Sequence, residues 1–113
     1  SACLVGSEMC IRDRNKMSKI YISGPITGIE DYMKNFDQAE KELKSVGFSV
    51  VNPAKILSQM PEDTKYEEYM DMSMMMLSMC DGIYMLKGWE KSTGANREYE
   101  YALASDMIIM REL

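Results

Sequence analysis

The sequence predicts an α/β fold in which a small, open, parallel four-stranded sheet carries helices on both faces, as in flavodoxin-like and Rossmann-like domains. Four short apolar runs alternate with segments whose apolar residues recur at helical spacing. Gly, Pro or Asn stands at the end of several of these segments, which is typical of turns between elements. Strands that alternate with helices favour a parallel sheet with right-handed crossovers, and we expect the strand order 2-1-3-4.

The first half of the chain predicts two strands joined by one helix. Residues 17–23 are expected to form the first strand, which runs into a loop over residues 24–28 that contains two glycines. Asp31 can cap a helix that continues to residue 46, because apolar or small residues recur there at helical spacing. A glycine then ends the helix, and residues 48–51 predict the second strand.

The second half repeats the alternation. Residues 54–60 are expected to be a loop or one short helical turn. Residues 61–80 predict a helix, with Thr64 and Glu67 at the spacing of a capping box. The remaining elements are a strand over residues 82–86, a helix over residues 93–105 and a last strand over residues 107–110.

The N-terminal segment is expected to be foreign to the fold. Residues 4–14 match one translated reading frame of a transposase adaptor used in sequencing libraries. A natural basic leader is the alternative, but the segment lacks the apolar core of a signal peptide and the amphipathic pattern of a transit peptide. We therefore predict a disordered, non-native leader over residues 1–16 and one α/β domain over residues 17–113.

Composition excludes several classes of protein. The chain has no His, and from Met17 onward only Cys80 remains, so we expect neither an internal disulfide nor a zinc site. A net charge of −5 argues against binding to nucleic acid polymers or anionic membranes. No apolar run reaches the roughly 18 residues that a membrane span needs. These features predict a cytoplasmic protein without a metal or redox cofactor.

The stretch over residues 88–98 is the strongest candidate for a ligand site. A strand that leads through a glycine-containing loop into a helix aims unpaired N–H groups and the positive end of the helix dipole at a ligand. Glu98 lies about one turn into this helix, with the small residues Gly94 and Ala102 on the same face. With the order 2-1-3-4, the loop after the first strand converges on the same crevice.

Three motifs resemble one family of enzymes. They are Tyr21-Ile22-Ser23-Gly24-Pro25-Ile26-Thr27-Gly28, then Cys80-Asp81-Gly82-Ile83-Tyr84, and then Ser92-x-Gly94-x-x-x-Glu98-x-x-x-Ala102. Their order and spacing resemble the nucleoside 2-deoxyribosyltransferase superfamily, and within it a group of small phage and bacterial proteins of unassigned function. The resemblance runs from about Met17 to the C-terminus.

The resemblance implies an N-glycosidase or deoxyribosyltransferase that acts on a nucleoside or nucleotide. It implies that Glu98 attacks C1′ of the sugar and that Tyr21 orients this carboxylate. A carboxylate nucleophile divides a difficult displacement into two steps through a glycosyl-enzyme, which water or a second base then resolves. The residues that we expect to bind substrate are Ser23, Gly24, Gly28, Gly88, Trp89, Ser92 and Gly94.

The chain departs from the pattern of these enzymes at the general acid. The enzymes carry an acid eight residues before the Asp that opens the third strand, and this chain has Ser73 there. Asp71 is two residues away, roughly 200° around a helix. The nucleotide-hydrolysing branch also has Ser and Arg where Pro25 and Thr27 stand. The alternative function is therefore a non-catalytic nucleotide-binding module with the same fold.

Several residues keep a structural alternative. Glu98 could be an exposed partner of Lys91 or Arg97, Ser92 could be a plain helix cap, and Trp89 could stack on a base or lie at an interface. Methionines at positions 70, 72, 74, 75, 76 and 79 surround one helix, more than one buried face requires. They predict a homo-oligomer, and Cys80 next to them is expected to be a buried, inert thiol.

Overall fold

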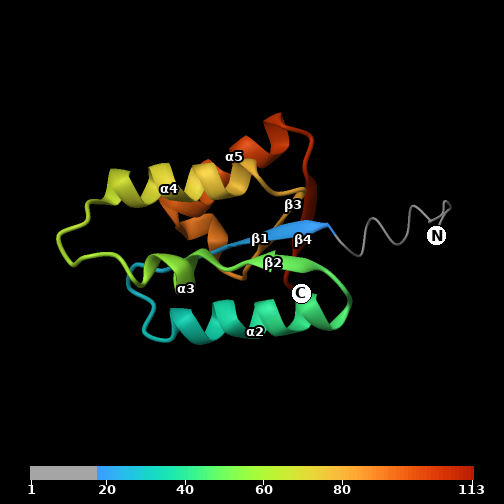
Figure 1. Cartoon of the computed structure of the whole chain (residues 1–113), viewed down its shortest axis with the longest axis horizontal. Coiled ribbons are helices and arrows are strands. Elements are labelled where there is room, and N and C mark those ends of the chain that lie inside the picture. Colours follow the sequence, from blue (N-terminus) through green and yellow to red (C-terminus); the bar gives the residue numbers. More distant parts are fainter. Residues whose placement is uncertain (1–17) are drawn as a thin grey trace, which may run out of the picture.

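The computed structural model describes residues 18–113 and shows four parallel strands in the order β2-β1-β3-β4 (Figure 1). The elements in chain order are β1 (Lys19–Ser23), α2 (Tyr32–Ser45), β2 (Ser49–Val51), α3 (Pro53–Leu57), α4 (Tyr66–Ser78), β3 (Gly82–Met85), the short 3₁₀ helix η1 (Trp89–Lys91), α5 (Thr93–Ala104) and β4 (Ile108–Arg111). The predicted fold class and strand order are confirmed. The predicted leader over residues 1–16 lies outside the described residues.

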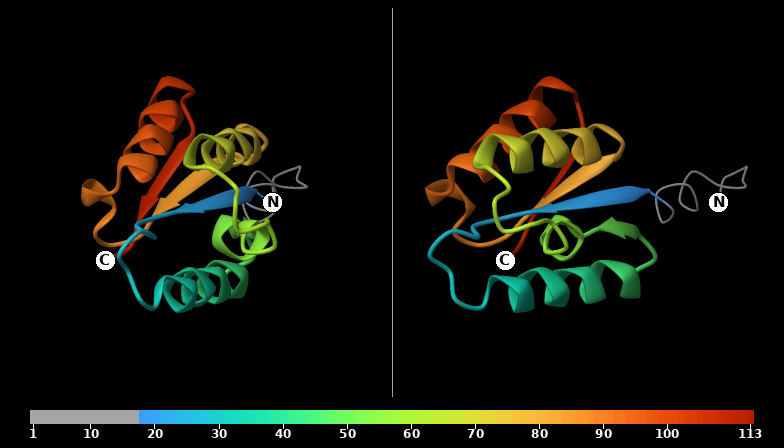
Figure 2. Two further views of the ribbon diagram at one scale, coloured as in Figure 1. Left: turned by 90° about the vertical axis from the view of Figure 1, so that its left-hand side faces the viewer. Right: turned by 60° about the vertical axis from the view of Figure 1, so that its left-hand side comes forward.

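The helices cover both faces of the sheet. Helices α4 and α5 lie on one side of it and α2 lies on the other (Figure 2). Strand β1 sets this division, because successive side chains of a strand point to opposite faces. Ile20 and Ile22 pack toward α2, whereas Tyr21 packs toward α4 and α5. Ser23, two residues after Tyr21, shares its face.

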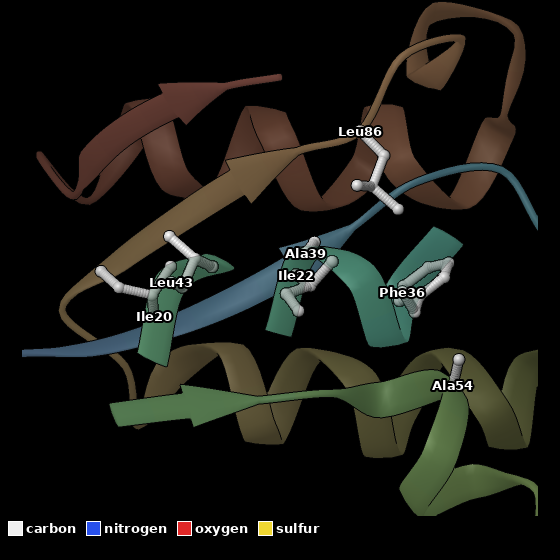
Figure 3. Packing of buried hydrophobic residues seen from close by; sticks show 7 residues of the cluster. All are labelled: Ile20, Ile22, Phe36, Ala39, Leu43, Ala54 and Leu86. Carbon is white, nitrogen blue, oxygen red and sulfur yellow. The ribbon is translucent and has the colours of Figure 1, made fainter. Parts of the chain in front are cut away.

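Two apolar clusters hold these layers together. Beneath α2, the buried residues are Ile20, Ile22, Phe36, Ala39, Leu43, Ala54 and Leu86 (Figure 3). Beneath α4 and α5, they are Tyr21, Leu77, Ile83, Met85, Ala95 and Ala102. Each of these side chains is at most 5% exposed, so the two clusters fix where α2, α4 and α5 sit on the sheet.

The start of α4 differs from the sequence prediction. The helix begins at Tyr66 rather than in the Pro61–Thr64 segment, because Thr64 closes a turn there: its N–H and its hydroxyl both donate to the Pro61 carbonyl, at 3.1 and 2.7 Å. The predicted capping box of Thr64 and Glu67 is therefore wrong. The capping contact lies one residue later, where the Lys65 N–H donates to Glu68 Oε1 at 2.8 Å.

Residues 54–60 were predicted as a loop or one short helical turn, and the structure bears out the second alternative. The segment after β2 forms the helix α3, with Pro53 at its first position and the Asn52 side chain accepting a hydrogen bond from the Lys55 N–H at 3.2 Å. Asp31 occupies the N-cap position of α2, but its side chain makes no capping hydrogen bond. Asp81 connects the starts of the two central strands, β1 and β3, since its Oδ2 accepts from the Lys19 N–H at 2.9 Å.

The methionines of α4 divide between core and surface. Met70 is 5% exposed, whereas Met75 and Met79 are 64% and 58% exposed.

Within residues 18–113, no helix has the length and apolar character to cross a membrane. The same residues contain no group of three His, Cys, Asp or Glu side chains placed to hold a metal ion.

Candidate active site

Glu98 forms the floor of the candidate site. It is 6% exposed, and two hydroxyl groups of β1 donate hydrogen bonds to its carboxylate. Tyr21 Oη lies 2.6 Å from Glu98 Oε2, and Ser23 Oγ lies 2.5 Å from Glu98 Oε1. Each oxygen thus has one donor from the strand. The carboxyl group is held in one orientation at the end of β1.

The strand and helix geometry explains why these three residues meet. Tyr21 and Ser23 are two residues apart on β1, so their side chains leave the same face of the sheet. Helix α5 covers that face, and its buried residues Ala95, Glu98 and Ala102 are three and four residues apart on one side of the helix. Glu98 is the polar member of this buried stripe.

The surroundings of Glu98 act on its pKa in opposite directions. Burial raises the pKa of Glu98 above its ordinary value, while the hydrogen bonds from Ser23 and Tyr21 and the charge of Arg97 work against that rise. Arg97 itself points away and pairs with Glu67 at 3.4 Å. The alternative reading of Glu98 as an exposed partner of Lys91 or Arg97 is therefore wrong.

Tyr21 stays protonated and acts as a donor. Burial and the neighbouring Glu98 charge raise the pKa of Tyr21 well above its ordinary value, and a hydrogen bond with the Ser73 side chain opposes that rise. Ser73 is itself buried, at 6% exposure on α4. A chain of polar groups therefore connects Ser73 through Tyr21 to Glu98 beneath α4 and α5.

A cavity of about 1240 Å³ opens above this floor. Its walls come from the loop after β1, the first turns of α2 and α3, the segment that joins α3 to α4, the middle of α4 and the start of α5. The candidate residues that line it are Tyr21, Ser23, Gly24, Gly88, Ser92, Gly94 and Glu98. The two glycine-bearing loops thus meet at one cavity beyond the carboxyl end of β1.

Two candidate residues lie elsewhere. The Trp89 side chain belongs to η1, is absent from the cavity wall, and packs against Tyr99 with ring centroids 4.6 Å apart. The prediction that Trp89 stacks on a substrate base therefore does not fit its position. Gly28 also does not line the cavity. It occupies a turn with φ +79°, closed by the Ile29 N–H donating to the Ile26 carbonyl at 3.1 Å.

Ser92 and Gly24 have local structural tasks as well as a place in the wall. Ser92 is the N-cap of α5, where its hydroxyl accepts from the Ala95 N–H at 3.2 Å. Gly24 allows the β1 loop to pass close to β3, because an added Cβ would lie 2.7 Å from Leu86 Cβ. Leu86 also donates its N–H to the Ser23 carbonyl at 2.8 Å.

Some features of the site were not predicted from the sequence. The link between Ser73 and Tyr21 depends on the placement of α4, which the sequence pattern does not give. Tyr32, Tyr66 and Tyr69 also line the cavity, from α2 and α4. The clustering of tyrosines at the start of α4 was the signal available for this wall. Asp71 does not line this cavity, so it supplies no replacement acid there.

Comparisons with known proteins agree with this architecture. The sequence profile described as "Domain of unknown function (DUF4406)" matches residues 18–111. The fold is similar to that of a 2-deoxyribosyltransferase from the psychrotolerant bacterium Bacillus psychrosaccharolyticus, with a TM-score of 0.68 and 20% sequence identity. The match covers 83% of this chain and 71% of that chain, and it shows that the two proteins share a similar fold. No curated protein matches the sequence.

Proposed function

The chain belongs to the DUF4406 family, and we propose that it is an N-glycosidase or 2-deoxyribosyltransferase-like enzyme that cleaves the base–sugar bond of a nucleoside or nucleotide. One observation carries this proposal. The Glu98 carboxylate is buried at the floor of a large cavity and is held by the hydroxyls of Tyr21 and Ser23. The structurally similar enzyme is described as a 2-deoxyribosyltransferase suited to nucleoside synthesis.

In the proposed mechanism, Glu98 acts as the nucleophile. An ionised carboxylate has about four acceptor sites, so an oxygen that accepts one hydrogen bond keeps a lone pair for attack on C1′. Attack displaces the base and leaves a glycosyl ester on Glu98. Water then releases the sugar, or a second base takes it up. Tyr21 and Ser23 are positioning residues, because their hydroxyls fix the orientation of the carboxylate.

The electrostatics of the site suit this role. Burial raises the pKa of Glu98, and a more basic carboxylate is a stronger nucleophile. The two hydroxyl donors favour the charged form and oppose that rise in the pKa. The activity of a Glu98-dependent enzyme should therefore rise with pH through the pKa of Glu98, because only the ionised form attacks C1′.

The second candidate function is a nucleotide-binding module without turnover. Ser73 favours it, because Ser73 stands at the position of the general acid in the resembling enzymes. A missing positioned acid typically lowers the rate by 10²- to 10⁴-fold. A binding module would keep the cavity, and its affinity for nucleosides would survive the loss of the Glu98 charge.

The test follows base release from a panel of nucleosides and 5′-monophosphates by liquid chromatography. Wild-type protein should release base, Glu98→Gln should not, and mass spectrometry of the intact protein should detect a sugar adduct on the wild type. Glu100→Gln is the matched control, because Glu100 is an exposed carboxylate on the same helix. Binding without base release that is unchanged in Glu98→Gln would instead support the binding module.

We also propose a homo-oligomer that uses the exposed methionines of α4. Met75 and Met79 are one helical turn apart and both largely exposed, so they form an apolar strip that a second copy could cover. Analytical ultracentrifugation at tens of micromolar should show an assembly that Met75→Lys weakens. Sedimentation of the wild type as a monomer at that concentration would refute this proposal.

A further inference from the structure

The wall of the cavity carries little positive charge and few acids. Among the described lining residues, Lys91 is the only basic side chain, and Glu62 and Glu98 are the only carboxylates. Three tyrosines also line the cavity, Tyr32 from α2 and Tyr66 and Tyr69 from α4. Aromatic faces bind cations, so these tyrosines suit a positively charged ring.

The position beside Tyr21 carries no acid that could protonate the departing base. Beside Tyr21, where α4 faces the floor, the side chain is Ser73, and an alcohol does not act as a general acid at neutral pH. The Tyr21 hydroxyl already donates its hydrogen bond to Glu98. Glu62 is exposed and lies in the segment between α3 and α4. Without a proton from the position beside Tyr21, a neutral base would leave as an anion.

A cationic base does not need that proton. When Glu98 attacks C1′, an electron pair of the carboxylate forms the new C–O bond and the C1′–N bond breaks. The electrons of the C1′–N bond pass to the ring nitrogen and cancel the positive charge of the base. The base therefore leaves as a neutral molecule. Water then adds its oxygen to C1′, the carboxylate is restored, and one proton is released to solvent.

We propose that the substrates of this site are nucleosides or nucleotides whose base is cationic, such as N7-alkylated purines or N-linked pyridiniums. This inference rests on the proposed function, because it assumes that Glu98 is the nucleophile. The apolar and aromatic wall would bind the charged ring, and the missing acid would select against neutral bases. In this proposal, Ser73 determines the specificity of the site for cationic bases.

The experiment compares matched pairs that differ by one methyl group and one charge. These are 7-methylguanosine with guanosine, and 7-methyl-2′-deoxyguanosine with 2′-deoxyguanosine. Base release is measured with and without protein, and the spontaneous rate is subtracted. We expect kcat/KM for the methylated member of a pair to exceed that of the neutral member by about 10²-fold or more, the typical contribution of a general acid. Glu98→Gln should abolish the enzymatic release of both.

Two variants test the reason for the preference. Ser73→Asp should raise the rate on neutral nucleosides and leave the rate on cationic ones nearly unchanged, while Ser73→Asn, of similar size but without an acid, should raise neither. Glu62→Gln should not abolish release from the neutral member of a pair, because Glu62 is not expected to protonate the base. If Ser73→Asp fails to fold, the inference is still tested by the ratio of kcat/KM values within a pair for the wild type and by base release in Glu62→Gln.

The outcomes separate this inference from the proposed function. Glu98-dependent release with similar kcat/KM for both members of a pair would overturn the inference and leave the proposed function standing. Loss of neutral-base release in Glu62→Gln would also overturn it, because Glu62 would then be the missing acid. No release from any pair would reject the proposed function itself.

Discussion

Removing the Tyr21 hydroxyl tests the central contact of the site without requiring enzymatic activity. Tyr21→Phe keeps the buried ring but deletes the donor that lies 2.6 Å from Glu98 Oε2. When Glu98 is ionised, this is a hydrogen bond to a charged group, with a typical net value of about 1.5–3 kcal/mol. When Glu98 is protonated, it is a neutral bond with a value of about 0.5–1.5 kcal/mol.

The expected loss of stability therefore depends on pH. Tyr21→Phe should lower the free energy of unfolding by about 1.5–3 kcal/mol at pH 8 and by a smaller amount near pH 4, where more of Glu98 is protonated. At about 4–8 °C for each kcal/mol in a domain of this size, the pH 8 loss corresponds to roughly 6–24 °C in Tm. Urea unfolding at both pH values gives the free energies directly.

The control is Tyr84→Phe on the neighbouring strand β3. Tyr84 is partly buried, and the structure of residues 18–113 shows no hydrogen bond from its hydroxyl. Tyr84→Phe should change the free energy of unfolding by less than Tyr21→Phe does, and the change should not depend on pH in the same way. A Tyr21→Phe effect below about 0.5 kcal/mol, or one equal at pH 4 and pH 8, would refute the assignment of Tyr21 as a donor to an ionised Glu98.

Three further predictions concern the same region. Burial raises the pKa of Glu98 above its ordinary value of 4.5, so just above pH 4.5 the folded state binds more protons than the unfolded state. The free energy of unfolding of the wild type should therefore fall relative to that of Glu98→Gln as the pH rises from 4.5 through the raised pKa. Urea unfolding of both proteins measures this difference. Burial raises the pKa of Cys80 to about 11, so alkylation of its peptide at pH 8, followed by mass spectrometry, should be on the order of 100-fold slower in the folded protein than after unfolding. Gly24→Ala should lower the free energy of unfolding by about 1–3 kcal/mol, because the new Cβ would overlap Leu86. In a double-mutant cycle, adding Leu86→Ala to this variant should recover part of the lost stability.

The fold was predictable because its signals are periodic. Ile20 and Ile22 alternate with Tyr21 along β1, and helical spacing marks α2 and α5, so the strand order and the layers follow from local pattern and from the rules for parallel sheets. The spacing of Glu98 to Gly94 and Ala102 placed the three residues on one face of α5, but it left open whether Glu98 is buried. The element ends were less predictable: α4 starts later, because the turn at Thr64 competes with helix formation.

The details of the site depend on side-chain directions that sequence spacing does not specify. Trp89 lies in the predicted loop, but the 3₁₀ helix η1 turns its ring toward Tyr99. Ser23 was expected to contact substrate, and its hydroxyl instead donates to Glu98. A serine hydroxyl can serve either task, and only the approach of α5 to β1 decides between them. Tertiary packing thus determined the roles that local patterns left open.

The cost of keeping Glu98 buried is an argument for function. A carboxylate that is 6% exposed loses much of its hydration, and no basic side chain forms a salt bridge with it in residues 18–113. Two neutral hydroxyls offset part of that loss. An apolar residue at this position of the α5 stripe, with apolar partners in place of Tyr21 and Ser23, would avoid the cost altogether. Stability alone therefore gives no reason for a glutamate here, whereas a nucleophile at the floor of a cavity requires one.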